Sequence, residues 1–274
     1  MAVIALSDGF GLLDTLGSGG AIAPSLLCVA VWEMIWPEHK AAQPFLGRWV
    51  SNFSLFAGSV VLTTLLAPSL ALITNAALER SLFRWAPGEA GFWLHLALAL
   101  LVLDALNYVL HRTLHAVPLF WRLHALHHTD LALDVSTTIR HHPLEAVFTA
   151  VIIGAAGALL GCSAFEVAAY GMLETMVQLI GHADVRLAKS LNRVLGAVFV
   201  TPRFHRIHHS SARHETDSNY GQVFAFWDRL FGTSGGYADE TRGTIEYGLK
   251  SFRDVRSQRL DQLLLLPVLA VSRD

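Results

Sequence analysis

The chain has 274 residues, of which 53% are hydrophobic and 15% are charged, whereas soluble domains carry about 25% charged residues. Its mean hydropathy of +0.44 is typical of an integral membrane protein rather than a soluble domain. The formal net charge of −2 and the lack of a run of basic residues exclude the usual signals of a nucleic-acid-binding protein.

The start of the chain predicts no cleavable signal peptide. Residues 1–16 carry two aspartates and neither lysine nor arginine, whereas a signal peptide begins with basic residues. The two cysteines, Cys28 and Cys162, both lie in apolar stretches. We therefore expect neither a disulfide framework nor a thiolate metal site.

Five apolar runs follow one another along the chain and predict membrane-embedded helices. They cover residues 21–36, 53–78, 91–110, 144–161 and 164–181. Pro68 in the second run indicates a kink or a break between two helices. The third run has about the 20 residues that a bilayer core requires. Because only Cys162 and Ser163 separate the last two runs, these predict a helical hairpin that dips into or crosses the membrane.

The basic residues predict the orientation of these helices. Lysines and arginines follow the first, third and fifth runs, and cytoplasmic loops carry an excess of these residues. Placing them in the cytoplasm puts the start of the chain outside and leaves only Arg80 and Arg84 on the far side. The histidine motifs between residues 111 and 209 then fall on the cytoplasmic side, at or just beyond helix ends.

Twelve of the 14 histidines lie between residues 111 and 214. Nine of them form a pair, two triplets and one single position: His111 and His115; His124, His127 and His128; His205, His208 and His209; and His182. Residues three or four apart share a face of a helix, and imidazole is the commonest metal ligand. One metal usually takes three or four protein ligands, so nine candidates fit two metals better than one. Imidazole suits zinc, copper, iron and nickel alike and does not identify the metal.

Residues near these motifs predict how the histidines are held. Thr201 and Pro202 predict the start of the helix that carries the last triplet. Asp104 and Asn107 precede His111 by seven and four residues, so we expect them to bond the far nitrogens of ligating imidazoles. The isolated His39, His95 and His214 are interpreted as ordinary side chains rather than ligands.

Residues 252–266 alternate between apolar and charged side chains and predict an amphipathic helix. At this length the helix is too short to span a bilayer. We expect it to lie on the membrane surface or on the body of the protein.

Over about residues 95–250 the chain resembles the fatty acid hydroxylase superfamily, often labelled sterol desaturase. Besides the histidine motifs, the resemblance rests on residues 133–137, 140–145, 201–210, 215–221 and 227–233. The last of these motifs are most similar to the bacterial and alkylglycerol monooxygenase-like branch. Members are integral membrane di-iron enzymes that use O2 and two external electrons to hydroxylate or desaturate lipids.

Carried over by position, the resemblance implies that the nine histidines bind two non-haem iron ions. These ligands are His111, His115, His124, His127, His128, His182, His205, His208 and His209. His142 and Glu145 match the family's His-Pro-x-Glu motif and are expected just outside the ligands. Two positions depart from the family: Gln178 replaces a histidine that the fatty acid 2-hydroxylases have four residues before the ligand at His182, and Asn107 replaces a tyrosine. A water is expected to complete the site at Gln178.

The resemblance also implies partners. The substrate would be a membrane lipid, such as a sterol, a fatty acyl chain or an ether lipid, with O2 as co-substrate. Because the sequence has no flavin, haem or NAD(P) motif, a separate ferredoxin, cytochrome or reductase would supply the electrons. The lipid, the choice between hydroxylation and desaturation, and the oligomeric state stay open.

Together these features predict an all-α, polytopic membrane protein with about four to five membrane-embedded helices and a cytoplasmic histidine-rich cap, in a bacterial inner membrane. We expect N-terminal membrane helices in residues 1–90, a catalytic domain in residues 91–250 and the amphipathic helix in residues 251–274. The alternative is a metal-binding or metal-transporting membrane protein without oxygenase activity. Ionisable residues of transporters lie near the bilayer midplane, whereas these histidines lie past helix ends.

Overall fold

The computed structural model describes residues 12–39, 45–82, 89–236 and 245–269. Over these ranges the secondary structure is helical, with three isolated antiparallel bridges in place of strands. The helices are α1 (Leu12–Ile35), α2 (Phe45–Glu79), α3 (Glu89–Ala116), α4 (Pro118–His128), η1 (Val135–Ile139), α5 (Pro143–Leu159), α6 (Ala164–His182), α7 (Lys189–Gly196), α8 (Pro202–His208), α9 (Arg213–Thr216), α10 (Phe226–Leu230), α11 (Leu260–Leu265) and η2 (Leu266–Val268). The predicted all-α fold is confirmed for the described residues.

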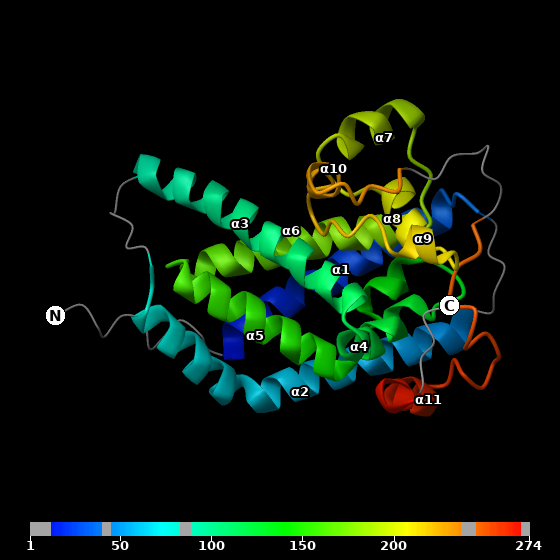
Figure 1. Cartoon of the computed structure of the whole chain (residues 1–274), viewed down its shortest axis with the longest axis horizontal. Helices are drawn as coiled ribbons and strands as arrows, with labels where there is room; N and C mark the ends of the chain where they lie inside the picture. Colours follow the sequence, from blue (N-terminus) through cyan, green and yellow to red (C-terminus); the bar gives the residue numbers. More distant parts are fainter. Residues whose placement is uncertain (1–11, 40–44, 83–88, 237–244, 270–274) are drawn as a thin grey trace.

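The long helices α1, α2, α3, α5 and α6 form the body of the molecule, and the short helices gather at one end of it (Figure 1). α2 packs mainly along α5, whereas α6 packs against α1, α3 and η1. α5 and α6 therefore spread apart from the short turn that joins them, as Figure 1 shows. The predicted tight turn is present, but the two helices pack on different partners instead of on each other.

Two helices are long and apolar enough to cross a membrane, judged by length and composition: Leu46–Glu79 and Gly91–Ala116. The apolar segments Ala23–Ile35 and Pro143–Leu159 are shorter. Large side chains such as Leu65 and Leu72 on α2 are 71% exposed, and apolar surface of this extent faces lipid more readily than water. These features indicate a membrane protein.

α2 continues through Pro68 as one helix of 35 residues, so the second apolar run contains no break. A proline removes one backbone hydrogen bond and bends a helix without necessarily ending it. Figure 1 shows α2 curving between its two ends. Of the two predicted outcomes, the bend is the one found.

The predicted helix over residues 252–266 is wrong in its first half. Residues 252–259 form turns, and Phe252 has a φ of 67°, which a right-handed helix does not allow. The Asp254 side chain accepts a hydrogen bond from the Ser257 backbone N–H at 2.9 Å, an arrangement that competes with helix formation. The helix α11 begins at Leu260. Leu263 of this helix and Leu266 of η2 pack in one core cluster with Leu55 and Trp121. This segment therefore lies on the body of the protein.

Candidate metal centre

Four helices bring nine histidines to the same end of the molecule. The pair at His111 and His115 lies in the last turns of α3, the first triplet lies in α4, His182 ends α6, and the second triplet lies in α8 and its last cap residue. α8 begins at Pro202 as predicted. Each of the nine side chains is buried, with at most 4% exposed. Burial of this many imidazoles calls for partners that satisfy their nitrogens.

The nine histidines divide into two groups, in each of which the candidate ligand nitrogens lie within 4.8 Å of one another. The five-histidine pocket consists of His111, His115, His124, His128 and His208. The four-histidine pocket consists of His127, His182, His205 and His209. The described residues thus offer two separate sets of buried imidazoles, each large enough to hold a metal ion.

Helical geometry explains this division. Residues four apart stay within one pocket: the pair in α3, His124 with His128, and His205 with His209. Residues three apart separate, because three steps of about 100° leave them about 60° apart around the helix. His127 and His208 are therefore each directed into the other pocket. The first triplet supplies two histidines to the five-histidine pocket and one to the four-histidine pocket. The second triplet does the reverse.

The distances between imidazole nitrogens fit a bound metal. In the five-histidine pocket the Nε2 atom of His111 lies 3.0 Å from that of His124 and 3.1 Å from that of His208. In the four-histidine pocket the Nε2 atom of His182 lies 3.1 Å from that of His127 and 3.0 Å from that of His205. Two nitrogens that bind one metal at about 2.1 Å and at right angles are about 3 Å apart. The donor sets therefore fit first-row metal ions.

Burial keeps these imidazoles neutral. Burial, together with the neighbouring histidines, holds the pKa values of His127, His128, His205 and His209 well below their usual range. Burial lowers the pKa of His208 to about 3, although a hydrogen bond to the Ser218 carbonyl acts in the opposite direction. Neutral imidazole is the form that binds a metal.

Backbone carbonyls orient several of the rings from behind. His111 Nδ1 lies 2.8 Å from the Tyr220 carbonyl and 2.7 Å from the Gln222 side-chain amide, and His208 Nδ1 donates to the Ser218 carbonyl at 2.7 Å. In the other pocket His182 Nδ1 donates to the Gln178 carbonyl at 2.9 Å. A proton held on Nδ1 leaves Nε2 without one and facing the pocket, which is the tautomer that ligation requires.

Glu145 contacts one histidine of the centre directly, as expected. Its carboxylate accepts a hydrogen bond from His124 Nδ1 at 2.7 Å. The same oxygen lies 3.2 Å from His141 Nδ1, and the His141 ring stacks on His127 with centroids 4.3 Å apart. Glu145 and His141 thus connect the two pockets from outside. His141 was missed in the sequence, because it lies just before the start of α5 and helical spacing does not mark it.

The predicted role of Asp104 is wrong. Its carboxylate accepts hydrogen bonds from the backbone N–H groups of Val223 and Phe224 and from Trp227 Nε1, at 2.9 to 3.0 Å. Seven residues along a helix span about 10 Å, so Asp104 lies too far from the rings to bond them. It instead anchors the segment whose Tyr220 carbonyl orients His111.

Asn107 also differs from the prediction in its contacts, and Gln178 bonds a backbone carbonyl. Asn107 Nδ2 donates to the Tyr170 hydroxyl at 2.9 Å and to Glu174 Oε1 at 2.8 Å. Gln178 Nε2 donates to the Gln222 carbonyl at 2.6 Å. Both amides therefore link helices or loops beside the pockets, and none of the described hydrogen bonds joins either side chain to an imidazole.

His142 caps the start of α5. Its Nδ1 accepts from the Leu144 backbone N–H at 3.1 Å, and its Nε2 bonds the Leu264 carbonyl at 3.3 Å. Because adjacent residues point in different directions at the start of α5, His141 is the one directed to the pockets. None of the described hydrogen bonds joins the His142 side chain to one of the nine histidines.

Arg140 supports α4, the helix that carries the first triplet, because its Nε donates to the Leu126 carbonyl. This fully buried side chain donates to Asn52 Oδ1, to the Thr129 hydroxyl and to Gln258 Oε1, at 2.8 to 2.9 Å. These partners come from α2, the end of α4 and the C-terminal segment. Arg140 therefore joins three distant parts of the chain directly behind the centre.

None of the three isolated histidines belongs to either histidine pocket. His39 is exposed and its Nδ1 lies 2.7 Å from Asp184 Oδ1. His214 lines an open hollow of about 640 Å³ with Arg213, Asp217 and Lys250. His95 forms a further group with Cys162 and Glu166.

Comparisons with known proteins agree with the geometry. The model of the family described as fatty acid hydroxylase matches residues 96–233. The chain is 28% identical to ornithine lipid hydroxylase OlsE of Rhizobium tropici, over 75% of this chain and 63% of that protein. It is 33% identical to alkylglycerol monooxygenase of Caenorhabditis elegans, over 47% of this chain and 25% of that protein.

A third relative is the very-long-chain aldehyde decarbonylase GL1-6 of Oryza sativa subsp. indica, at 30% identity over 50% of this chain and 22% of that protein. The chain thus spans less than two thirds of the length of each of these relatives. No solved structure matches it.

Proposed function

This chain belongs to the fatty acid hydroxylase family, and from that premise we propose that it is a membrane di-iron oxygenase that uses O2 to hydroxylate or desaturate a lipid. The observation that carries the proposal is the division of nine buried histidines into two adjacent pockets of five and four. Neither pocket contains a cysteine or a carboxylate, so a histidine-only centre is the chemistry that these residues support.

Each pocket would hold one iron ion through the Nε2 atoms that converge in it. Bound iron supplies the reduction of O2, with electrons from a donor, and the removal of hydrogen from an unactivated C–H bond. The protein contributes three things: neutral imidazoles, rings fixed by backbone carbonyls, and exclusion of water by burial. Glu145 and His141 would keep the two pockets in a fixed relation, because they contact one ring of each.

The substrate would be a lipid that reaches the centre between the helices. Two relatives are named for action on lipids, an ornithine lipid hydroxylase and an alkylglycerol monooxygenase. The apolar and exposed surface of α2 supports a site of entry from the bilayer. A separate ferredoxin, cytochrome or reductase would bring the electrons, since the sequence carries no flavin, haem or NAD(P) motif.

We place the protein in a bacterial inner membrane with four to five embedded helices. These are drawn from the long helices α1, α2, α3, α5 and α6. The nine-histidine end would face the cytoplasm. The distribution of lysine and arginine supports this orientation, and the nine histidines lie at the opposite end of α3 from the α5–α6 connection (Figure 1).

Labelling tests the orientation. In a Cys28→Ser variant, a membrane-impermeant thiol reagent added from outside should modify a cysteine introduced at Gly88 and spare one introduced at Ser211. Labelling at Ser211 with protection at Gly88 would reverse the proposed orientation.

Metal analysis and product analysis test the activity. Protein purified with iron present should contain two irons per chain, and isotopically labelled O2 should yield an oxygenated or desaturated lipid in an iron-dependent reaction. Comparison of the lipids of a deletion strain with those of the parent strain identifies the substrate. One metal ion per chain together with no iron-dependent oxygen consumption would contradict the proposal. A loaded protein that consumes no O2 would favour the metal-binding or metal-transporting alternative.

A further inference from the structure

A second group of metal-binding residue types lies far from the nine histidines. His95 comes from the first half of α3, Cys162 from the α5–α6 connection and Glu166 from the first turn of α6. Their candidate ligand atoms lie within 4.8 Å of one another. His95 and His111 are 16 residues apart on one helix, which corresponds to about 24 Å. The group is therefore separate from both histidine pockets.

The three side chains are buried and already face one another. Their exposed fractions are 8% for His95, 7% for Cys162 and 2% for Glu166. His95 Nδ1 lies 2.6 Å from Glu166 Oε1. The other carboxylate oxygen, Oε2, accepts hydrogen bonds from the Ser163 backbone N–H at 2.8 Å and from its hydroxyl at 2.9 Å. One oxygen of Glu166 thus caps α6, and the other is directed to His95.

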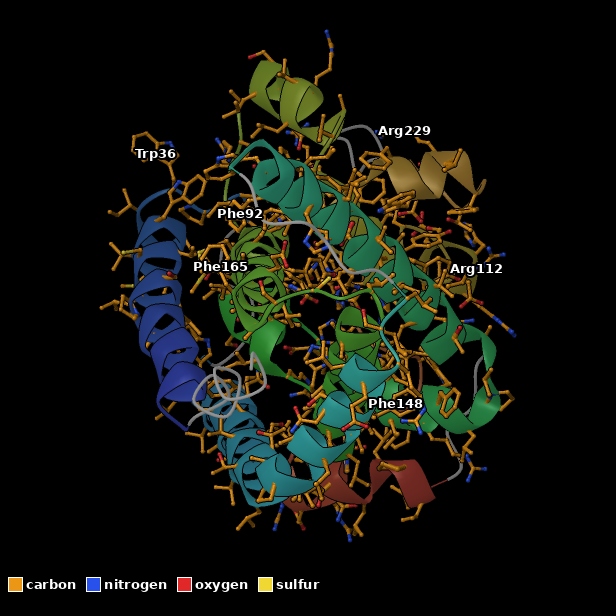
Figure 2. The ribbon with its side chains drawn as sticks, turned by 90° about the vertical axis from the view of Figure 1, so that its left-hand side faces the viewer. Trp36, Phe92, Arg112, Phe148, Phe165 and Arg229 are labelled. Atoms are coloured by element: carbon orange, nitrogen blue, oxygen red, sulfur yellow. The ribbon has the colours of Figure 1, made fainter. Side chains whose placement is uncertain are left out.

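Two aromatic side chains close to this group along the chain also bring α3 and α6 together. The rings of Phe92 and Phe165, one on each of the helices that carry His95 and Glu166, have centroids 6.0 Å apart. Figure 2 looks onto this end of the molecule and shows the two rings between α3 and α6. An imidazole, a thiol and a carboxylate at one buried point form a typical donor set for zinc.

We propose that His95, Cys162 and Glu166 form a site for a zinc-like divalent cation, separate from the nine-histidine centre, which ties α3 to the α5–α6 connection. A water would take the fourth position, as it does in zinc sites that have three protein ligands. Binding would form a metal–sulfur bond and release the thiol proton to solvent, with no change in oxidation state. Burial raises the pKa of the free Cys162 thiol to about 11, so the thiol stays protonated and unreactive until a cation displaces its proton.

The chain offers a selective spectroscopic test. It has two cysteines, so Cys162 is the only thiol in a Cys28→Ser variant, and neither histidine pocket contains a cysteine. Cobalt(II) added to the full-length Cys28→Ser protein should give a thiolate-to-cobalt charge-transfer band that zinc abolishes. The Cys28→Ser/Cys162→Ser variant should give no such band while it binds as much iron. Absence of the band in Cys28→Ser at saturating cobalt would overturn the proposal.

Two further measurements do not depend on the folding of that double variant. In the wild-type protein, zinc should slow alkylation of Cys162 at least about tenfold and leave the exposed Cys28 unchanged as an internal control. Equal rates with and without zinc would show that the three residues form hydrogen bonds only. Glu166→Gln keeps the cap, because glutamine serves at this position of a capping box, and should weaken cobalt binding at least about tenfold. Unchanged cobalt affinity would show that Glu166 is not a ligand of the site.

Discussion

The five-histidine and four-histidine pockets share α4 and α8, but α3 contributes only to the first and α6 only to the second, and the contacts behind their rings differ. In the five-histidine pocket, His111 and His208 contact the carbonyls of Tyr220 and Ser218, and His124 donates to Glu145. In the four-histidine pocket, His182 has a carbonyl partner at 2.9 Å and His127 has a longer contact of 3.3 Å to the Arg140 carbonyl.

The smaller pocket therefore has one ligand fewer, and one of its two contacts to backbone carbonyls is long. Each pocket also has a buried Nδ1 atom without a hydrogen-bond partner among the described residues, at His128 in the larger pocket and at His205 in the smaller one. The side chain of Gln178, one helical turn before His182, bonds the Gln222 carbonyl instead of adding a fifth ligand. In metalloenzymes the site with fewer protein ligands leaves positions for other molecules. We expect the four-histidine pocket to be the more easily perturbed and the one with room for non-protein ligands.

The largest effect is expected at His182. In His182→Ala the four-histidine pocket keeps three ligands, and we expect its iron affinity to fall by more than about 100-fold. Metal analysis should then return one iron per chain, retained in the five-histidine pocket, and lipid product should be lost. Retention of two irons would remove the proposed difference between the pockets.

His208→Ala is the matching change in the five-histidine pocket. Four ligands remain, so iron should be retained better than in His182→Ala, whereas activity should fall by at least about 10- to 100-fold because a ring next to the bound metal is lost. The measurement is iron content and product for both variants side by side. Full activity in His208→Ala would contradict the di-iron proposal itself.

Glu145→Gln tests the connection between the pockets. The amide keeps the shape of the side chain but loses the charge that accepts from His124 and faces His141. Loss of such a partner typically costs about 10- to 100-fold in metal affinity or activity. Because Glu145 contacts His124 directly and His127 through the His141 ring, both irons should dissociate faster on addition of a chelator. Faster loss of only one iron would show that Glu145 serves a single pocket.

His142→Ala should have the smallest effect of these substitutions. His142 caps α5, and loss of a helix cap costs about 0.5–2 kcal/mol of stability. We expect a lower unfolding temperature with two irons retained and most activity kept. His214→Ala, at an exposed side chain that belongs to neither pocket, is the control and should leave both quantities unchanged. Loss of iron in His142→Ala would show that this residue supports the metal centre.

Features that repeat locally along the chain were predictable from the sequence. The long helices follow from runs of apolar residues, and the start of α8 follows from Thr201 and Pro202. The grouping of histidines within each motif follows from their spacing of three and four residues, because helical periodicity needs no knowledge of the rest of the fold. The C-terminal helix shows the limit, since a local side-chain bond from Asp254 replaces its first half by turns.

The tertiary structure decided how these local features combine. The triplets were expected to present one face each, but packing of four helices directs His127 and His208 into the opposite pockets. The supporting groups behind His111 and His208 are backbone carbonyls, which every residue has and which no sequence pattern marks. Asp104 shares a helical face with His111 but lies about 10 Å from it along the axis, so only the position of the partner segment could assign its role.

The same reason explains the group around His95. By sequence alone, His95 is an isolated histidine and Cys162 a cysteine in an apolar stretch. They meet because α3 passes the α5–α6 connection, a contact between residues 67 positions apart. Sequence determines which side chains lie on one face of one helix, over a few residues. Contacts between helices depend on the packing of the whole chain, and it is packing that decided which histidines share a metal and which carboxylate serves them.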